Sequence, residues 1–176
     1  MDDEPEDSLY DVLQEVLTLL PEALDFTKTI AEKLPEMVET LTTVAIVTNL
    51  LALHQYGGRL GPARSNALVE QVVGAAFQTF EGFDPHPTFF EKAAMLLRGI
   101  TQGHPFEDAN KRTGFLVAFY YLEQVGFLPA APLPQRELVE FSQQVSTGEI
   151  RDVGIIAERL SSFWGYTTAG KLLSSD

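Results

Sequence analysis

Eight consecutive apolar or aromatic residues, from Phe115 to Leu122, constrain the fold of this chain more than any other stretch. A helix with apolar side chains on every face has no side to turn toward water, so this segment must be buried all round. Gly126 follows it and is expected to end it. The sequence therefore predicts a buried central helix that other elements must cover.

The polar segment before this helix carries the residues from which chemistry is expected. It reads Gly103-His104-Pro105-Phe106-Glu107-Asp108-Ala109-Asn110-Lys111-Arg112-Thr113-Gly114. Asn110 is a good N-cap residue, which places Lys111 and Arg112 in the first turn of the helix. The helix macrodipole disfavours cations at that end, so this pair indicates an anion between them, for which a phosphate is the natural choice. The alternative is a capped buried helix whose charges are only solvated.

Apolar residues at helical spacing predict further helices along the chain. The expected ranges are about 8–20, 22–33, 36–54, 67–80, 88–102 and 135–146, with one more from about 150 to 163. Pro21 and Pro35 are placed as first-turn residues, so each is expected to begin a new helix. Thr88 and Glu91 form a capping box before the helix that leads to His104. The predicted fold class is all-α, a helical bundle around the central helix.

Length and composition suit one globular domain with a sizeable core. The chain has 176 residues, 45% of them hydrophobic, and no cysteine. A disulfide framework or a thiolate metal site is therefore excluded, and since no basic-then-apolar leader is seen, a reducing cytoplasm is the expected location. The longest apolar run, Val44 to Leu53, is too short to span a bilayer, so it is interpreted as a core helix. No membrane segment is expected.

The net charge of −13 is concentrated at the N-terminal end. Residues 1–40 hold 12 acidic and 2 basic residues, a balance of −10, whereas residues 41–176 hold 13 acidic and 10 basic residues, a balance of −3. Because this charge repels phosphates and no basic stripe with aromatics appears elsewhere, direct binding of nucleic acid is not expected. The acidic segment is either a solvated face or a surface that docks onto something cationic, including the region of Lys111 and Arg112.

The segment from His104 to Phe115 resembles the signature of the Fic/Doc family, His-x-Phe-x-Asp/Glu-Gly-Asn-Gly-Arg-x-x-Arg. The residues in register with it are His104, Phe106, Asp108, Asn110 and Arg112. Ala109 and Lys111 replace the two glycines, which gives the Asp-Ala-Asn-Lys-Arg-Thr string of the death-on-curing (Doc) branch. Phe115 stands where the closing arginine would be.

The resemblance implies a role for each motif residue. His104 would be the general base, Asp108 would hold Mg²⁺, and Phe106 would face the core and anchor the loop. The phosphates of ATP, the co-substrate, would bind at Ala109, Asn110, Lys111 and Arg112. These roles suit the chemistry, because a neutral imidazole accepts the proton of an attacking hydroxyl, and a dication held by a carboxylate and phosphate oxygens is usual in phosphoryl transfer.

Three functions remain open at this point. The lysine of the Doc branch goes with transfer of the terminal phosphate, so the resemblance favours a growth-arresting toxin. Such a toxin would phosphorylate a Ser or Thr hydroxyl of a target protein, for example elongation factor Tu, and would pair with an antitoxin. The alternatives are nucleotidyl transfer (AMPylation), as in the family at large, and a non-catalytic nucleotide- or protein-binding module, since Phe115 removes a phosphate-binding arginine. The oligomeric state is not set, and an oligomer is compatible with all three.

The resemblance also suggests how the chain is divided. Residues 1–53 would be an acidic N-terminal helical extension, 54–163 the Fic/Doc-like domain and 164–176 a C-terminal tail. The extension would either cover the site or bury the apolar faces of its own helices. The Gly- and Pro-rich stretch from Phe80 to Pro87 would be a short β-hairpin flap that clamps the target by strand addition, or an ordinary connector.

Overall fold

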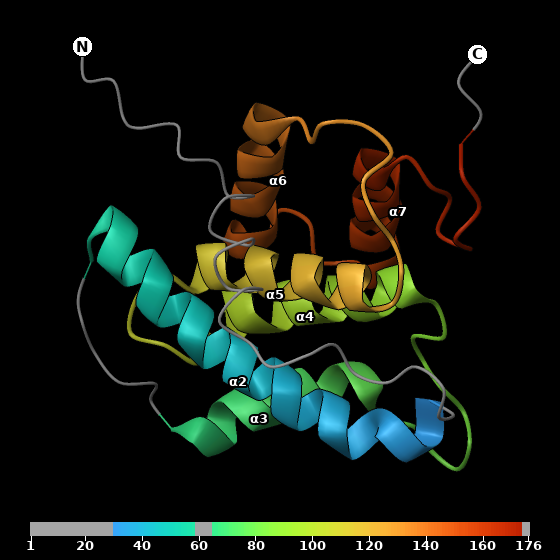
Figure 1. Cartoon of the computed structure of the whole chain (residues 1–176), viewed down its shortest axis with the longest axis horizontal. Helices are drawn as coiled ribbons and strands as arrows, with labels where there is room; N and C mark the ends of the chain where they lie inside the picture. The colour runs from blue at the N-terminus through green and yellow to red at the C-terminus, as the bar shows by residue number, and fades with distance from the viewer. Residues whose placement is uncertain (1–29, 59–64, 174–176) are drawn as a thin grey trace.

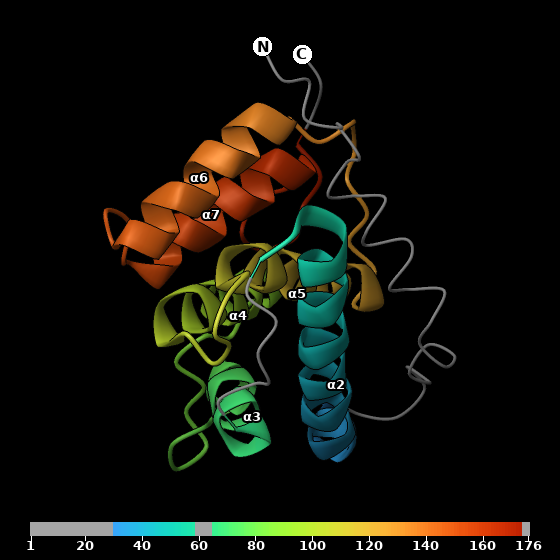
Figure 2. The ribbon, with the colours of Figure 1, turned by 90° about the vertical axis from the view of Figure 1, so that its left-hand side faces the viewer.

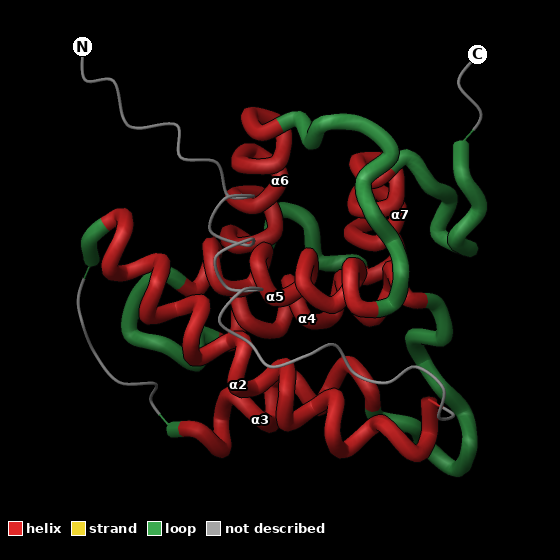
Figure 3. The backbone as a smooth tube through the Cα atoms, in the orientation of Figure 1, coloured by secondary structure: helices red, strands yellow, loops and turns green. Residues whose placement is uncertain are grey.

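The central helix α5, Asn110–Gln124, lies in the middle of the fold and is buried along nearly its whole length. The computed structural model describes residues 30–58 and 65–173, and all regular elements within these ranges are helices (Figure 1, Figure 3). The all-α prediction is therefore confirmed. The apolar run from Phe115 to Leu122 is buried throughout, as its lack of a polar face requires.

Helix α4, Phe89–Gly103, lies against α5 and leads directly into the polar loop. The predicted capping box is present, because the Thr88 side chain accepts from the Glu91 N–H and the Glu91 carboxylate accepts from the Thr88 N–H. The two helices approach closely at Gly114. A Cβ atom there would come within 2.9 Å of Thr101 Cγ2 and 3.0 Å of the Leu97 carbonyl oxygen.

Two pairs of elements cover the α4–α5 pair from opposite sides (Figure 2). On one side lie α6, Gln135–Thr147, and α7, Val153–Trp164. On the other lie α2, Ile30–Tyr56, and α3, Asn66–Gly74, which continues into the short 3₁₀ helix η1, Ala75–Phe77. The helix predicted for 67–80 therefore ends earlier and tightens in its last turn. The hydrophobic core is continuous across α2, α4, α5, α6 and α7.

The prediction that Pro35 begins a new helix is wrong, because α2 runs from Ile30 to Tyr56 with Pro35 inside it. A proline within a helix removes one backbone hydrogen bond and crowds the preceding turn. The loss falls near the start of a 27-residue helix whose face with Met37, Leu41 and Val44 is buried in the core. Burial of that face outweighs one missing hydrogen bond.

Helix α2 is also long and apolar enough, from Pro35 to Tyr56, to cross a membrane by length and composition alone. Several of its apolar side chains, among them Met37, Leu41 and Val44, instead belong to the same core as those of α4 and α5. The run from Val44 to Leu53 lies within it, so the interpretation of this run as a core helix is confirmed.

The helices predicted for 8–20 and for most of 22–33 lie outside the described residues. The predicted boundary between residues 53 and 54 falls inside α2, three residues before its end. The division into an extension of residues 1–53, a domain of 54–163 and a tail of 164–176 stays a prediction.

Candidate active site

The loop between α4 and α5 begins with His104, which ends α4 in a left-handed conformation with φ of 46° and has an exposed side chain. Pro105 and Phe106 follow and are buried, so Phe106 holds the loop in the core. Ala109 is left-handed as well, with φ of 59°. Residues other than glycine adopt this region at a cost of about 1–2 kcal/mol, so two strained residues bracket the loop.

Asn110 closes the loop on itself rather than capping α5. Its Oδ1 accepts from the Phe106 N–H at 3.0 Å, and its Nδ2 donates to the Phe106 carbonyl at 2.9 Å. The N-cap position belongs to Ala109 instead, so the N-cap prediction for Asn110 is wrong. An amide that satisfies both backbone groups of a residue four positions back is the better use of a buried Asn, because those groups would otherwise be unpaired.

Lys111 and Arg112 are exposed in the first turn of α5, where the sequence places them. Neither a side-chain cap nor an acidic first-turn residue is present at this helix start, within the part of the chain that the structure describes. The first-turn amides of a helix have no partner inside it, and the macrodipole makes this end positive. Two cations therefore add to an existing positive field, which is the arrangement that binds phosphate.

Asp108 is an exposed carboxylate next to this positive end. Its Oδ1 accepts from the Ala109 N–H at 2.6 Å, and its Oδ2 lies where a Cβ atom on Gly58 would come within 3.0 Å of it. No group of three or more metal-ligating side chains occurs among the described residues. A single carboxylate still fits Mg²⁺, because that ion is usually held by one or two carboxylates together with substrate phosphates.

The C-terminal half of α2 forms the neighbouring wall of the loop (Figure 2). Asn49 donates to the Asp108 carbonyl at 2.8 Å and to Thr113 Oγ1 at 3.1 Å. The Arg112 guanidinium lies over the ring of Tyr56, 4.6 Å from its centre. The sequence analysis did not identify Asn49 or Tyr56 as residues of the site. The polar Asn49 inside an apolar run was the one available signal, since a buried amide needs partners from elsewhere.

Phe115 points away from this edge and into the core. It is 2% exposed and packs edge-on against Phe119 and Phe141. Phe115 therefore serves the packing of the core at the position where the family signature has its closing arginine. Among the described residues at the start of α5, the positive charge comes from Lys111 and Arg112.

The stretch from Phe80 to Pro87, expected to be a β-hairpin flap or an ordinary connector, contains a tight turn at residues 80–83 rather than paired strands. Phe80 and Phe83 exchange both backbone hydrogen bonds at 2.8 Å, around Glu81 and Gly82 with positive φ. Residues paired in this way project their side chains to one face, and here the two rings are 62% and 68% exposed. We call residues 80–83 the aromatic turn.

A charge pair fixes the base of the aromatic turn to α4. Lys92 Nζ lies 2.6 Å from Asp84 Oδ2, and the Lys92 side chain is only 10% exposed. Burial disfavours the charged form of Asp84. The hydrogen bond from Lys92, the backbone N–H of His86 and the charges of Lys92 and His86 outweigh it, so the pKa of Asp84 is lowered. The ion pair between Lys92 and the ionised carboxylate of Asp84 therefore holds the aromatic turn against α4.

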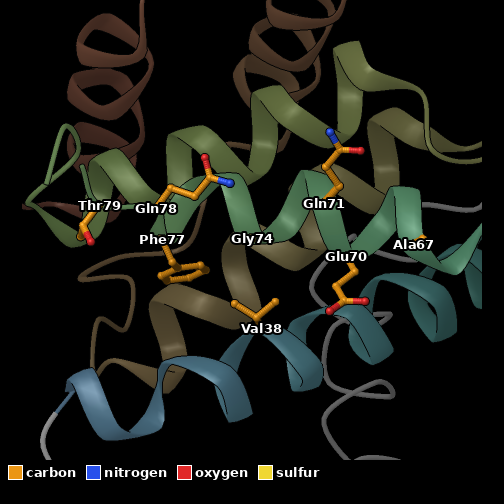
Figure 4. A pocket seen from close by; sticks show the side chains of 8 residues that line it. All are labelled: Val38, Ala67, Glu70, Gln71, Gly74, Phe77, Gln78 and Thr79. Atoms are coloured by element: carbon orange, nitrogen blue, oxygen red, sulfur yellow. The ribbon is translucent and has the colours of Figure 1, made fainter. Parts of the chain in front are cut away.

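A separate groove of about 550 Å³ lies between α2 and the α3–η1 segment (Figure 4). Its lining includes Val38, Gly74 and Phe77 together with the carboxylate of Glu70 and the amide of Gln71. Among the described residues, no Lys or Arg lines this groove, and Lys111 and Arg112 lie outside it.

Comparison with known proteins finds similarity in the part of the chain that contains this loop. A sequence model of the Fic/DOC family matches residues 30–122, which include α2, the loop and all but the last two residues of α5. The chain is 31% identical to a protein named Toxin Doc from Mycolicibacterium smegmatis over 108 residues, which cover 61% of this chain and 82% of that protein. It is 32% identical to Protein kinase doc of Escherichia phage P1 over 124 residues, which cover 66% of this chain and 91% of that protein.

Proposed function

The chain belongs to the Fic/Doc family, and we propose that it is a Doc-like toxin that transfers the terminal phosphate of ATP to a Ser or Thr hydroxyl of a target protein. The observation that carries this proposal is the arrangement of the exposed His104, the exposed carboxylate of Asp108 and two exposed cations on a single loop and helix start. The relative named as a protein kinase supports phosphate transfer over nucleotidyl transfer.

His104 is the general base of the proposed reaction. Its exposed imidazole takes the proton of the target hydroxyl as the hydroxyl oxygen bonds to the γ-phosphorus. The bond from that phosphorus to the β-phosphate bridging oxygen breaks at the same centre, and ADP leaves with the electron pair. The products are the phosphorylated target, ADP and one proton, which His104 later passes to solvent.

The start of α5 binds the phosphates and stabilises the developing charge. Lys111, Arg112 and the first-turn amides supply donors that are in place before reaction, which is where most electrostatic catalysis originates. Asn110 keeps these amides oriented by closing the loop on Phe106. Asp108 would hold Mg²⁺, whose role in phosphoryl transfer is to neutralise charge on the β- and γ-phosphate oxygens.

The aromatic turn is the proposed docking element for the target. Two exposed rings on one face give a large contact area with little conformational entropy to lose. The turn precedes α4 and the loop follows it, so a target segment docked on residues 80–83 would have to run along the 15 residues of α4, about 22 Å, to bring a hydroxyl to the loop. An antitoxin partner follows from the toxin relative, and a cytoplasmic location from a substrate such as ATP.

Labelled ATP separates the three candidate functions. The purified chain is incubated with a cell lysate, or with elongation factor Tu as the first single target, and with ATP labelled at either the γ or the α phosphate. Protein labelled only from γ-labelled ATP supports the proposal. Label from α-labelled ATP would show nucleotidyl transfer, and no label from either would show a binding module.

Lys111→Gly sharpens this test, because it restores the glycine of the nucleotidyl-transferring members. Removal of one preorganised cation from the phosphate site is expected to lower γ-phosphate transfer by about 10²-fold. Arg136, an exposed cation at the start of α6, offers a matched control as Arg136→Gly. Unchanged transfer in Lys111→Gly would remove the reason for preferring a kinase.

A further inference from the structure

We infer that Asn49 of α2 is a positioning residue for the proposed phosphate transfer, an inference that rests on the proposed function of the loop. Asn49 lies 59 residues before Asp108 in the sequence, yet its Nδ2 donates to the Asp108 carbonyl at 2.8 Å. The same nitrogen donates to Thr113 Oγ1 at 3.1 Å. One amide group therefore joins the loop and the first turn of α5 to a third helix.

The environment of Asn49 makes this contact a rigid one. Its side chain is 2% exposed, and the bond to Thr113 lies inside the protein. Thr113 Oγ1 in turn donates to the Ala109 carbonyl at 3.0 Å, so the chain of hydrogen bonds continues back into the loop. Buried hydrogen bonds that form a connected network restrict motion more than isolated surface ones.

The hydrogen bond from Asn49 reaches Asp108, the residue whose carboxylate would hold Mg²⁺ in the proposed reaction. Ala109 has a left-handed backbone, and Asp108 precedes it. A strained backbone persists only when its surroundings hold it from several directions. Asn110 holds the loop from the α5 side through Phe106, and Asn49 holds it from the α2 side. Without Asn49, the Asp108 carbonyl loses the hydrogen bond from the amide of Asn49, and the peptide between Asp108 and Ala109 is no longer held by this bond from the α2 side.

The test compares Asn49→Leu with Thr48→Val. Leucine is similar in size to asparagine and removes both donated hydrogen bonds. Thr48 is the buried neighbour, and its hydroxyl has no hydrogen-bond partner within the described structure, so valine at that position is a matched buried change that leaves the loop alone. Asn49→Ala is the milder second variant, because the space it leaves can admit a water molecule beside the Asp108 carbonyl.

Two readouts are measured on each variant at a temperature well below its melting point. The first is γ-phosphate transfer per folded molecule, which should fall about tenfold or more in Asn49→Leu and less in Asn49→Ala, because misplacement by about 1 Å costs up to about 10²-fold. The second is amide hydrogen exchange, which should rise in residues 104–110 and stay unchanged in α7. Thr48→Val should match the parent protein in both.

Each outcome decides a different point. Transfer within twofold of the parent in Asn49→Leu overturns the inference. Exchange that rises equally in the loop and in α7 also overturns it, because that pattern indicates a merely structural role. If the parent protein transfers no label, the proposed function fails. The exchange experiment then still tests whether Asn49 holds the loop, since it needs neither ATP nor a target.

Discussion

The loop from His104 to Arg112 and the half of α2 beneath it are built in opposite ways. The loop is contiguous in sequence and mostly exposed, and its residues are those that could touch a substrate. The α2 wall holds the loop through the buried Asn49 and the half-buried Tyr56, and Gly58, just after the end of α2, lies against the Asp108 carboxylate. The difference teaches that the chemistry of this site is local, whereas its geometry is set by contacts across the fold.

The largest expected effect tests the loop itself. Replacement of His104 by alanine should lower transfer by about 10²–10⁴-fold, because the target hydroxyl loses its general base. The fold should be retained, since the side chain is exposed. The measurement is initial-rate γ-phosphate transfer, with His54→Ala, another exposed histidine, as the control. A parental rate in His104→Ala would mean that the loop does not carry the chemistry.

The motif could be predicted from the sequence because its residues act over a few positions. The buried central helix, the capping box of Thr88 and Glu91 and the exposed cations at the start of α5 followed from periodicity and helix-end chemistry. The N-cap role of Asn110 was mispredicted because a buried Asn can satisfy a loop instead of a helix end. Local propensity does not distinguish the two.

The wall could not be predicted because its contacts join residues far apart in the chain. Nothing near Asn49 in sequence indicates that its partners are Asp108 and Thr113. The continuous path of α2 through Pro35 was mispredicted for a related reason, since tertiary burial overrode a local helix breaker. The aromatic turn was predicted as a flap or a connector, and its two-residue form depends on Glu81 and Gly82 adopting positive φ.

Substitution of Lys92, a buried residue away from the loop, sharpens the comparison between the loop and the α2 wall. Lys92→Met removes the ion pair of Asp84, which keeps the hydrogen bond from the His86 N–H, and should lower the free energy of unfolding by about 1–3 kcal/mol. The pKa of Asp84 is lowered in the folded state, so its contribution to stability is present above the ordinary value of 3.8 and is lost as pH falls below it. The difference between parent and variant should therefore be largest near neutral pH and shrink in acid.

Urea unfolding across this pH range provides the measurement for Lys92→Met. The rate of ATP hydrolysis per folded molecule should not change, because Lys92 forms its ion pair with Asp84, outside the loop from His104 to Arg112. Arg136→Met, which breaks an exposed pair with Glu140, is the control and should change stability little. A stability difference that grows in acid would contradict the assignment.

Backbone strain in the loop gives a smaller effect with the opposite sign. Ala109→Gly should raise the free energy of unfolding by about 0.5–1 kcal/mol, because glycine adopts the left-handed region without the cost that alanine bears. The gain is less than the full strain, since glycine also gains freedom in the unfolded chain. Thermal melting of Ala109→Gly beside Ala131→Gly, an exposed loop position of ordinary φ, measures it. Equal destabilisation of both would mean that Ala109 is not strained.

The smallest expected effect concerns the aromatic part of the wall. The Arg112 guanidinium lies 4.6 Å from the centre of the Tyr56 ring, and such contacts at exposed sites are worth about 0.5–1 kcal/mol. Tyr56→Leu should therefore release Arg112 and raise the KM for ATP about two- to fivefold, whereas Tyr56→Phe keeps the ring and should match the parent. Initial rates at varied ATP concentration measure this. If both variants raise the KM equally, the hydroxyl of Tyr56 rather than its ring supports the site, and the α2 wall acts on the loop through hydrogen bonds alone.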